Sequence, residues 1–197
     1  SGCGKSTAAL SILRLLPSPG AITGGKILFQ EADLLGLTVD QMRREIRGNK
    51  VSMIFQEPSK ALNPVLSVGD QIKESIRSHE KVGKSEANER TIKLLQDVGL
   101  PNPRELLKRY PFQLSGGMQQ RVMIAMAISC NPRLLIADEP TSSLDVTIEA
   151  QILELLRSLM DQKILSGMLF ISHDLAMIST VCDKIVVMYA GTVAEIG

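Results

Sequence analysis

The fold of this chain is decided by residues 114–145, LSGGMQQRVMIAMAISCNPRLLIADEPTSSLD. Ser115 is a favoured N-cap residue, and Gly116 and Gly117 leave the first backbone N–H groups of a helix open to an anion. Residues 122–128 are apolar on every helical face, which indicates a buried helix. The stretch therefore opens with a predicted buried helix whose N-terminus can bind an anion.

A short apolar run, residues 134–137, follows between two prolines and predicts a strand buried on both faces of a parallel sheet. Two adjacent carboxylates, Asp138 and Glu139, stand at its C-terminal end. Open α/β sheets bind their ligands at this edge, and a buried strand that ends in two acids indicates a cation or an attacking water. The sequence therefore predicts an α/β fold with its chemistry at the carboxyl end of this strand.

The start of the chain, SGCGKST at residues 1–7, matches the end of the phosphate-binding motif G-x-x-x-x-G-K-[ST]. In such a loop Lys5 would reach the β- and γ-phosphates of a nucleotide, and the Ser6 hydroxyl would bind Mg²⁺. A chance Gly-Lys-Ser turn is the alternative, and the two acids downstream argue against it. We expect a helix over residues 5–16, ended by Pro17. The motif's first Gly is missing and no initiator Met is present, so we expect a piece of a longer protein whose preceding strand leads into this loop.

Three motifs, LSGGM, ADEP and SSLD, resemble in order and spacing the signature motif, Walker B strand and D-loop of ATP-binding-cassette (ABC) ATPases. The resemblance covers essentially the whole chain and is strongest to the subfamily that powers oligopeptide, dipeptide and nickel importers. Met118 replaces the Gln of most of the superfamily, as is common in that subfamily. The resemblance implies a P-loop NTPase fold in one domain over residues 1–197. Its RecA-like parallel-sheet core would comprise residues 1–57 and 132–197, with an inserted helical subdomain at 58–131 and an antiparallel β part.

Two further segments match this family. VSMIFQEPSKALNP resembles the Q-loop, in which Gln56 would touch Mg²⁺ and the attacking water, and whose following segment faces the membrane subunits. His173 matches the H-loop His that contacts the γ-phosphate. Alone, a Gln or a His after a strand is more often a loop or structural residue. By the same resemblance Asp138 holds Mg²⁺ through water, and Glu139 orients or deprotonates the attacking water.

The implied cofactors are ATP and Mg²⁺, and the implied reaction is hydrolysis of the β–γ bond, in which positioning and charge stabilisation do most of the work. We expect Glu139, His173 and Lys5 to be catalytic. We expect Ser6, Gln56 and Asp138 to bind the metal. The signature motif would act in trans, on ATP held by a partner subunit. The expected nucleotide-binding residues are Ser1, Gly2, Cys3, Gly4, Lys5, Ser6, Thr7, Gln56, Ser115, Gly116, Gly117 and Met118.

Composition fits an ordinary globular domain, with 197 residues, 44% hydrophobic and 22% charged residues and a net charge of +1. No Lys/Arg stripe interleaved with aromatic residues occurs, so nucleic acid is not favoured as a partner. No apolar stretch is as long as a membrane span. The odd count of three cysteines fits a reduced cytosol, and we expect all three to be packing residues.

The remaining elements follow from local patterns. We expect strands at residues 26–29, 51–55 and 168–171, an amphipathic helix after Asp145, and a hairpin that turns at Ala190-Gly191. Capping signals predict further helix starts or ends at Thr38 with Gln41, Gly48, Ser67, Ser85, Gly99, Asn102-Pro103 and Pro111. His79 lies in a polar stretch, so we expect a solvated side chain.

The predicted function is ATP hydrolysis that powers import of peptides or nickel, by a peripheral protein at the cytoplasmic face of the cell membrane. The partners would be a second ABC ATPase subunit, identical or different, the transmembrane permease subunits and, indirectly, a substrate-binding protein. An ABC ATPase that acts in DNA repair or translation is the alternative. The DNA-acting class carries a long coiled coil between phosphate loop and signature, and the interval here lacks sustained heptads. The translation class, with two cassettes in one chain, stays open. A nucleotide sensor without turnover is disfavoured because Glu139 and His173 are both present.

Overall fold

A three-stranded parallel sheet forms the centre of the molecule, in a computed structural model that describes residues 2–142 and 144–197. Its strands are β3 (Val51–Ile54), β4 (Leu134–Asp138) and β5 (Gly167–Ile171), in the order β3-β4-β5. Ile54 pairs with Ala137, and Asp138 pairs with Ile171. The strands β3 and β4 are buried almost throughout, as expected for apolar runs in a parallel sheet.

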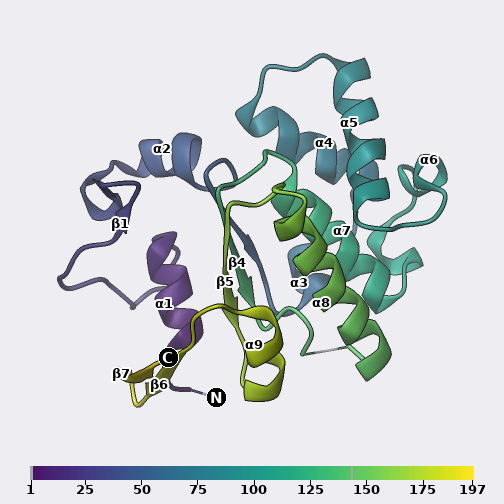
Figure 1. Ribbon diagram of the computed structural model, residues 1–197. Helices are drawn as coiled ribbons and strands as arrows, with labels where there is room; N and C mark the ends of the chain where they lie inside the picture. The colour runs from purple at the N-terminus through teal and green to yellow at the C-terminus, as the bar shows by residue number, and fades with distance from the viewer. Residues whose placement is uncertain (1, 143) are drawn as a thin grey trace.

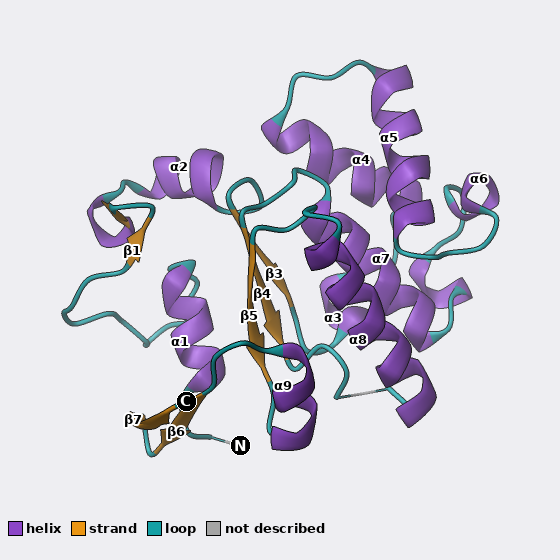
Figure 2. Ribbon diagram, in the orientation of Figure 1, coloured by secondary structure: helices purple, strands orange, loops and turns teal. Residues whose placement is uncertain are grey.

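Helices cover both faces of this sheet (Figure 2). Alternate strand residues point to opposite faces, and each set belongs to its own hydrophobic core. On one face Val51, Met53 and Ile136 pack with Ala9 and Leu13, which lie in or directly after α1 (Lys5–Ile12). On the other face Ile54, Leu135, Ala137 and Phe170 share a core with α7 (Gly116–Ile128) and α8 (Val146–Asp161). The sheet is therefore sandwiched, and its carboxyl ends open at one edge between the two layers.

A group of helices between β3 and β4 joins the larger core (Figure 1). Their bounds are α3 (Pro58–Ala61), α4 (Val68–His79), α5 (Lys84–Asp97), α6 (Pro103–Leu106), the 3₁₀ turn Pro111–Gln113 and α7. In the described residues, no helix combines the length and hydrophobicity that crossing a bilayer requires.

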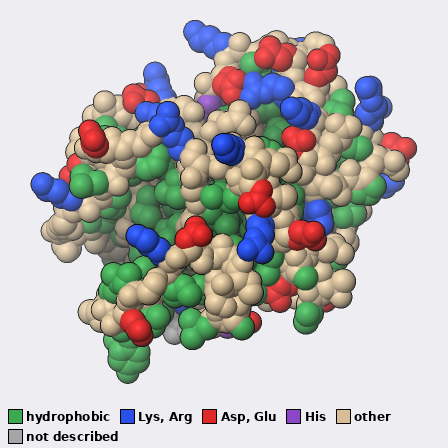
Figure 3. Space-filling view, in the orientation of Figure 1, with side chains coloured by type: hydrophobic (Ala, Val, Ile, Leu, Met, Phe, Trp, Pro, Cys, Tyr) green, Lys and Arg blue, Asp and Glu red, His purple; other side chains and the backbone are tan. Residues whose placement is uncertain are grey.

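Two small antiparallel ladders complete the fold. β1 (Leu28–Phe29) pairs with β2 (Ala32–Asp33), and β6 (Val186–Tyr189) pairs with β7 (Thr192–Ile196) around the predicted turn. Apolar side chains gather over the β6–β7 hairpin at the lower left of Figure 3. The segment between β2 and β3 holds Leu34–Gly36, α2 (Val39–Gln41) and the π-helical turn Met42–Ile46.

The predicted fold class is confirmed, and the capping box of Thr38 and Gln41, the Ser67 cap and the Gly99 stop all form. The predicted Ser85 cap is wrong, because α5 begins at Lys84 and its N-cap is Gly83, two residues earlier. The sequence analysis also missed α9 (Leu175–Val181), which Asp174 caps through the N–H groups of Ala176 and Met177.

The first helix is shorter than predicted: α1 ends at Ile12, not at residue 16. Arg14 takes a left-handed backbone conformation with φ of 52°, which no helix can continue. The Arg47 guanidinium donates to the carbonyls of Leu13 (2.8 Å) and Arg14 (2.9 Å). A distant cation therefore satisfies carbonyls at this helix end, where local sequence suggested Pro17 as the stop.

Candidate nucleotide site

Three strand ends bring three predicted site residues together. Gln56 follows β3, Glu139 follows β4 and His173 follows β5. The Gln56 side-chain amide donates to Glu139 Oε2 at 3.1 Å, and His173 Nδ1 lies 3.5 Å from Glu139 Oε1. The Glu139 carboxylate is therefore held between a neutral amide and an imidazole, and the latter contact becomes an ion pair only when His173 is protonated.

The backbone of Glu139 is strained. Its φ is 46°, in the left-handed region that residues other than Gly rarely adopt. Its N–H donates to the Ile171 carbonyl at 2.9 Å, so the chain stays attached to β5 as it leaves the sheet. The Glu139 side chain is 18% exposed and the His173 side chain is 67% exposed. The carboxylate is therefore fixed at the bottom of the site, while the imidazole reaches into solvent.

A second pair of side chains, Ser6 and Asp138, lies next to Glu139. The Ser6 hydroxyl donates to Asp138 Oδ1 at 3.0 Å, joining the start of α1 to the end of β4. Burial raises the pKa of Asp138 above its ordinary value, against a lowering by the Ser6 hydrogen bond; the neighbouring Glu139 raises it further and Lys5 lowers it. A buried carboxylate in this state gains most from a bound cation.

This pair fits Mg²⁺. Mg²⁺ takes oxygen ligands and is commonly bound by one or two carboxylates together with substrate phosphates, so a hydroxyl and a carboxylate suffice. Within residues 2–142 and 144–197, no group of three or more His, Cys, Asp and Glu side chains could hold a metal ion. Of the three predicted metal ligands, Gln56 hydrogen-bonds to Glu139, not to the Ser6–Asp138 pair.

The phosphate loop lies at the start of α1. Gly4 is the N-cap with φ of 98°, and α1 has no acidic residue of its own in its first turn, where the Asp138 carboxylate accepts from Ser6. Lys5 Nζ lies 3.8 Å from Cys3 Sγ. Gly2 and Thr7 are exposed, and Ser1 lies outside the described residues.

The loop is backed by the β6–β7 hairpin. The Gly191 N–H donates to the Cys3 carbonyl at 3.1 Å, and a Cβ added at Gly4 would lie 3.8 Å from both the Gly191 Cα and the Met188 Cε. Figure 1 shows the hairpin beside the start of α1. The sequence analysis found this hairpin but not its contact with the loop, because no local pattern links the two segments.

The signature residues form the predicted helix start. The Met118 N–H donates to Ser115 Oγ at 3.4 Å, so Ser115 caps α7. Among the described residues, no hydrogen bond joins Ser115–Met118 to the phosphate loop or to Glu139. One copy of the chain thus brings together the loop, Gln56, Asp138, Glu139 and His173, and leaves the signature helix start outside that group.

The two signature glycines differ in their surroundings, which gives a matched pair of variants. A Cβ at Gly117 would lie 2.8 Å from the Ile148 Cγ2 of α8, whereas a Cβ at Gly116 would lie 3.7 Å from Leu144. We expect Gly117→Ala to destabilise the protein by about 1–3 kcal/mol through overpacking. Gly116→Ala should change stability by less than about 1 kcal/mol. Chemical denaturation of both variants checks this; equal stabilities would contradict the close approach of α7 and α8.

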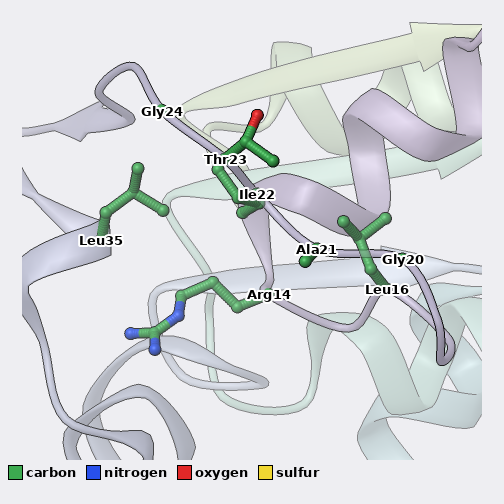
Figure 4. A pocket seen from close by; sticks show the side chains of 8 residues that line it. All are labelled: Arg14, Leu16, Gly20, Ala21, Ile22, Thr23, Gly24 and Leu35. Atoms are coloured by element: carbon green, nitrogen blue, oxygen red, sulfur yellow. The ribbon is translucent and has the colours of Figure 1, made fainter.

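Two cavities differ in chemistry. The smaller, of about 180 Å³, is lined by Glu139, His173 and residues of the segments that follow them, including Thr141, Glu149 and Met177. The larger, of about 380 Å³, lies between the loop 20–24 and the end of α1 (Figure 4). Its one cation, Arg14, already donates to the carbonyls of Leu34 and Leu37. The smaller cavity is therefore the one that the predicted catalytic residues Glu139 and His173 line. The sequence analysis did not single out Thr141 and Glu149, which also line it.

Comparisons with known proteins identify the family of the chain. A family model described as ABC transporter matches residues 1–142. The chain is 52% identical over 198 residues to the dipeptide transport ATP-binding protein DppD of Bacillus subtilis (strain 168), covering 100% of this chain and 58% of that protein. It is 51% identical over 197 residues to DppD of Escherichia coli (strain K12), covering 100% and 60%.

Among solved structures, the chain is similar to the ATP-binding cassette MJ0796, with a TM-score of 0.84. That structure is a dimer in a post-hydrolysis state, bound to ADP and phosphate. Its sequence identity is 27%, and the match covers 100% of this chain and 81% of that one. The chain spans less than two thirds of the length of the curated relatives above. The family model matches more than half of the chain, from the phosphate loop through the Walker B strand. The chain belongs to the ABC transporter family.

Proposed function

We propose that this chain hydrolyses ATP to power an ABC importer, and that the imported substrate is a peptide. One observation carries the proposal: Glu139 lies between Gln56 and His173, directly beside the Ser6–Asp138 pair that suits Mg²⁺. Phosphoryl transfer to water needs a positioned base next to a metal-bound phosphate; this arrangement offers a carboxylate for the first and a pair that could hold the metal for the second.

The residue roles follow from this arrangement. Lys5 and the N–H groups of the loop neutralise phosphate charge, and Ser6 with Asp138 holds Mg²⁺, which neutralises further charge on the phosphates when bound. Glu139 accepts the proton of the attacking water. His173, whose side chain is exposed, would contact the γ-phosphate. Gln56 orients Glu139 through its hydrogen bond in the absence of nucleotide. The remaining loop residues, from Ser1 to Thr7, contact the phosphates.

The partners are proposed from the relatives and from the surface. The two relatives named above are dipeptide transport ATP-binding proteins, which favours peptides over nickel. Val65, Tyr110 and Phe112 are exposed, and the rings of Tyr110 and Phe112 stack at a centroid distance of 5.7 Å. The Val68 N–H donates to the Arg109 carbonyl, which joins the segment of Val65 to the segment of the two rings. This apolar surface in residues 58–131, the proposed helical subdomain, would contact permease subunits at the cytoplasmic face of the membrane. Residues 115–118 would complete the site of a second ATPase subunit.

Transport and hydrolysis test this proposal. The full-length gene product is reconstituted with the permease subunits encoded beside it, and uptake of a labelled dipeptide is measured together with ATP hydrolysis. Both should require the wild-type Lys5, so Lys5→Ala is the inactive control. Uptake of Ni²⁺ without peptide would contradict the substrate. An ATPase that responds to DNA or ribosomes, and not to permeases, would favour the non-transport alternative.

A further inference from the structure

We infer that Glu149 is a positioning residue for Glu139 and acts through Thr141. This inference rests on the proposed function, in which Glu139 is the base. The Thr141 hydroxyl donates to Glu149 Oε1 at 2.7 Å. Thr141 is 5% exposed, so its hydroxyl depends on a protein partner. Nothing in the local sequence pattern marks either residue, yet both line the cavity that Glu139 and His173 also line.

Thr141 lies in a folded-back segment that begins at Glu139. The backbone N–H and the hydroxyl of Ser142 both donate to the Glu139 carbonyl, each at 3.2 Å. The Leu144 N–H donates to the Thr141 carbonyl at 3.0 Å. The strained backbone of Glu139 is therefore continuous with a short turn, and the Thr141 side chain connects that turn to another element.

That element is α8, which is held by its N-cap and by its buried inner face. Asp145 caps it by accepting from the N–H groups of Thr147 (3.1 Å) and Ile148 (3.0 Å). Ile152 and Leu156, on its inner face, are fully buried in the larger core. Glu149 lies in the first turn, where a carboxylate is favoured by the helix dipole. Glu149 is thus a hydrogen-bond acceptor for Thr141 on a helix whose position is fixed by the hydrophobic core.

The same hydroxyl faces the element that follows His173. Met177, on α9, has its Sδ 3.9 Å from Thr141 Oγ1. Thr141 therefore lies where the segments after β4 and β5 meet α8, behind the Glu139–His173 contact. Without the hydrogen bond to Glu149, the Thr141 side chain loses its contact with the first turn of α8, and we expect the turn that begins at Glu139, and with it the Glu139 carboxylate, to be held less precisely. Hydrolysis then suffers, whereas the phosphate loop and the Ser6–Asp138 pair are untouched.

The experiment compares four single variants, one double variant and one control variant of the full-length protein. Glu149→Ala and Thr141→Val remove the acceptor and the donor, and each should lower kcat about 10-fold, since small misplacements of a reacting group are costly. Glu149→Gln and Thr141→Ser keep the hydrogen bond and should stay within about twofold of wild type. The double variant Glu149→Ala/Thr141→Val should be no worse than either single change. KM for ATP should stay constant, and Glu154→Ala, which removes an exposed carboxylate on the same helix, is the control.

A readout independent of turnover separates this inference from the proposed function. Hydrogen exchange at the Ser142 and Leu144 amides should speed up in Glu149→Ala and not in Glu149→Gln. Unchanged exchange in Glu149→Ala overturns the inference, whether or not the wild type hydrolyses ATP. A loss of kcat in Glu149→Gln as large as in Glu149→Ala also overturns it, because charge would then matter, not the hydrogen bond. A wild-type protein that hydrolyses no ATP counts against the proposed function instead.

Discussion

Replacing Glu139 with Gln is expected to lower kcat about 10²–10⁴-fold while ATP binds with nearly wild-type affinity. Gln has the same size and keeps an oxygen that accepts from Gln56, so the geometry of the site survives. It cannot take a proton from water. The groups proposed to hold nucleotide and metal, Lys5, Ser6 and Asp138, do not depend on it, since Ser6 and Asp138 bond directly to each other.

Steady-state hydrolysis and equilibrium ATP binding, measured on the same preparation, check this expectation. The control is Glu154→Gln, which makes the same chemical change at an exposed position of α8. An ATP affinity that falls as far as kcat would show that Glu139 binds the nucleotide, and its role as the base would be wrong.

Replacing Ser115 with Arg is expected to leave ATP binding to a monomer unchanged and to prevent both dimer closure and hydrolysis. Ser115 is exposed at the start of α7, and it makes no contact with the phosphate loop of its own chain in the described residues. A long cation there would occupy the anion site that the γ-phosphate held by a second subunit needs.

Ser115→Ala separates this effect from simple loss of the helix cap, which costs about 0.5–2 kcal/mol of stability. The measurements are ATP affinity at low protein concentration and ATP-dependent dimerisation by analytical ultracentrifugation. We expect Ser115→Ala to dimerise and Ser115→Arg to remain monomeric. Reduced affinity in the monomeric Ser115→Arg protein would mean that the serine acts on its own subunit's nucleotide.

The sequence predicted the parallel sheet well because it depends on short, strongly patterned segments. The apolar runs that end at Gln56, Asp138 and His173 are strands of one parallel sheet, so their carboxyl ends had to meet at one edge. That geometry alone brings Gln56 and His173 to Glu139. The roles of these residues remain predictions.

Features that depend on contacts between distant segments could not be predicted. Arg47 looks like a surface cation in the sequence, yet it binds the carbonyls at the end of α1. His79 was expected in solvent, but its Nδ1 is buried without a hydrogen-bond partner among the described atoms, and a Cβ on Gly48 would lie 2.7 Å from its Nε2. The role of Glu149 could not be predicted for the same reason, because its partner Thr141 lies on a turn that forms only in the folded chain.

The hydrogen bond from Gly191 to the Cys3 carbonyl has a consequence for how the protein is made. At a synthesis rate of about 5–20 residues per second, residue 191 leaves the ribosome roughly 10–40 s after residue 3. During that interval the phosphate loop exists without the hairpin that backs it. Nucleotide stabilises only a state that binds it, so we expect ATP to assist folding of the nascent chain most strongly after this hairpin has emerged.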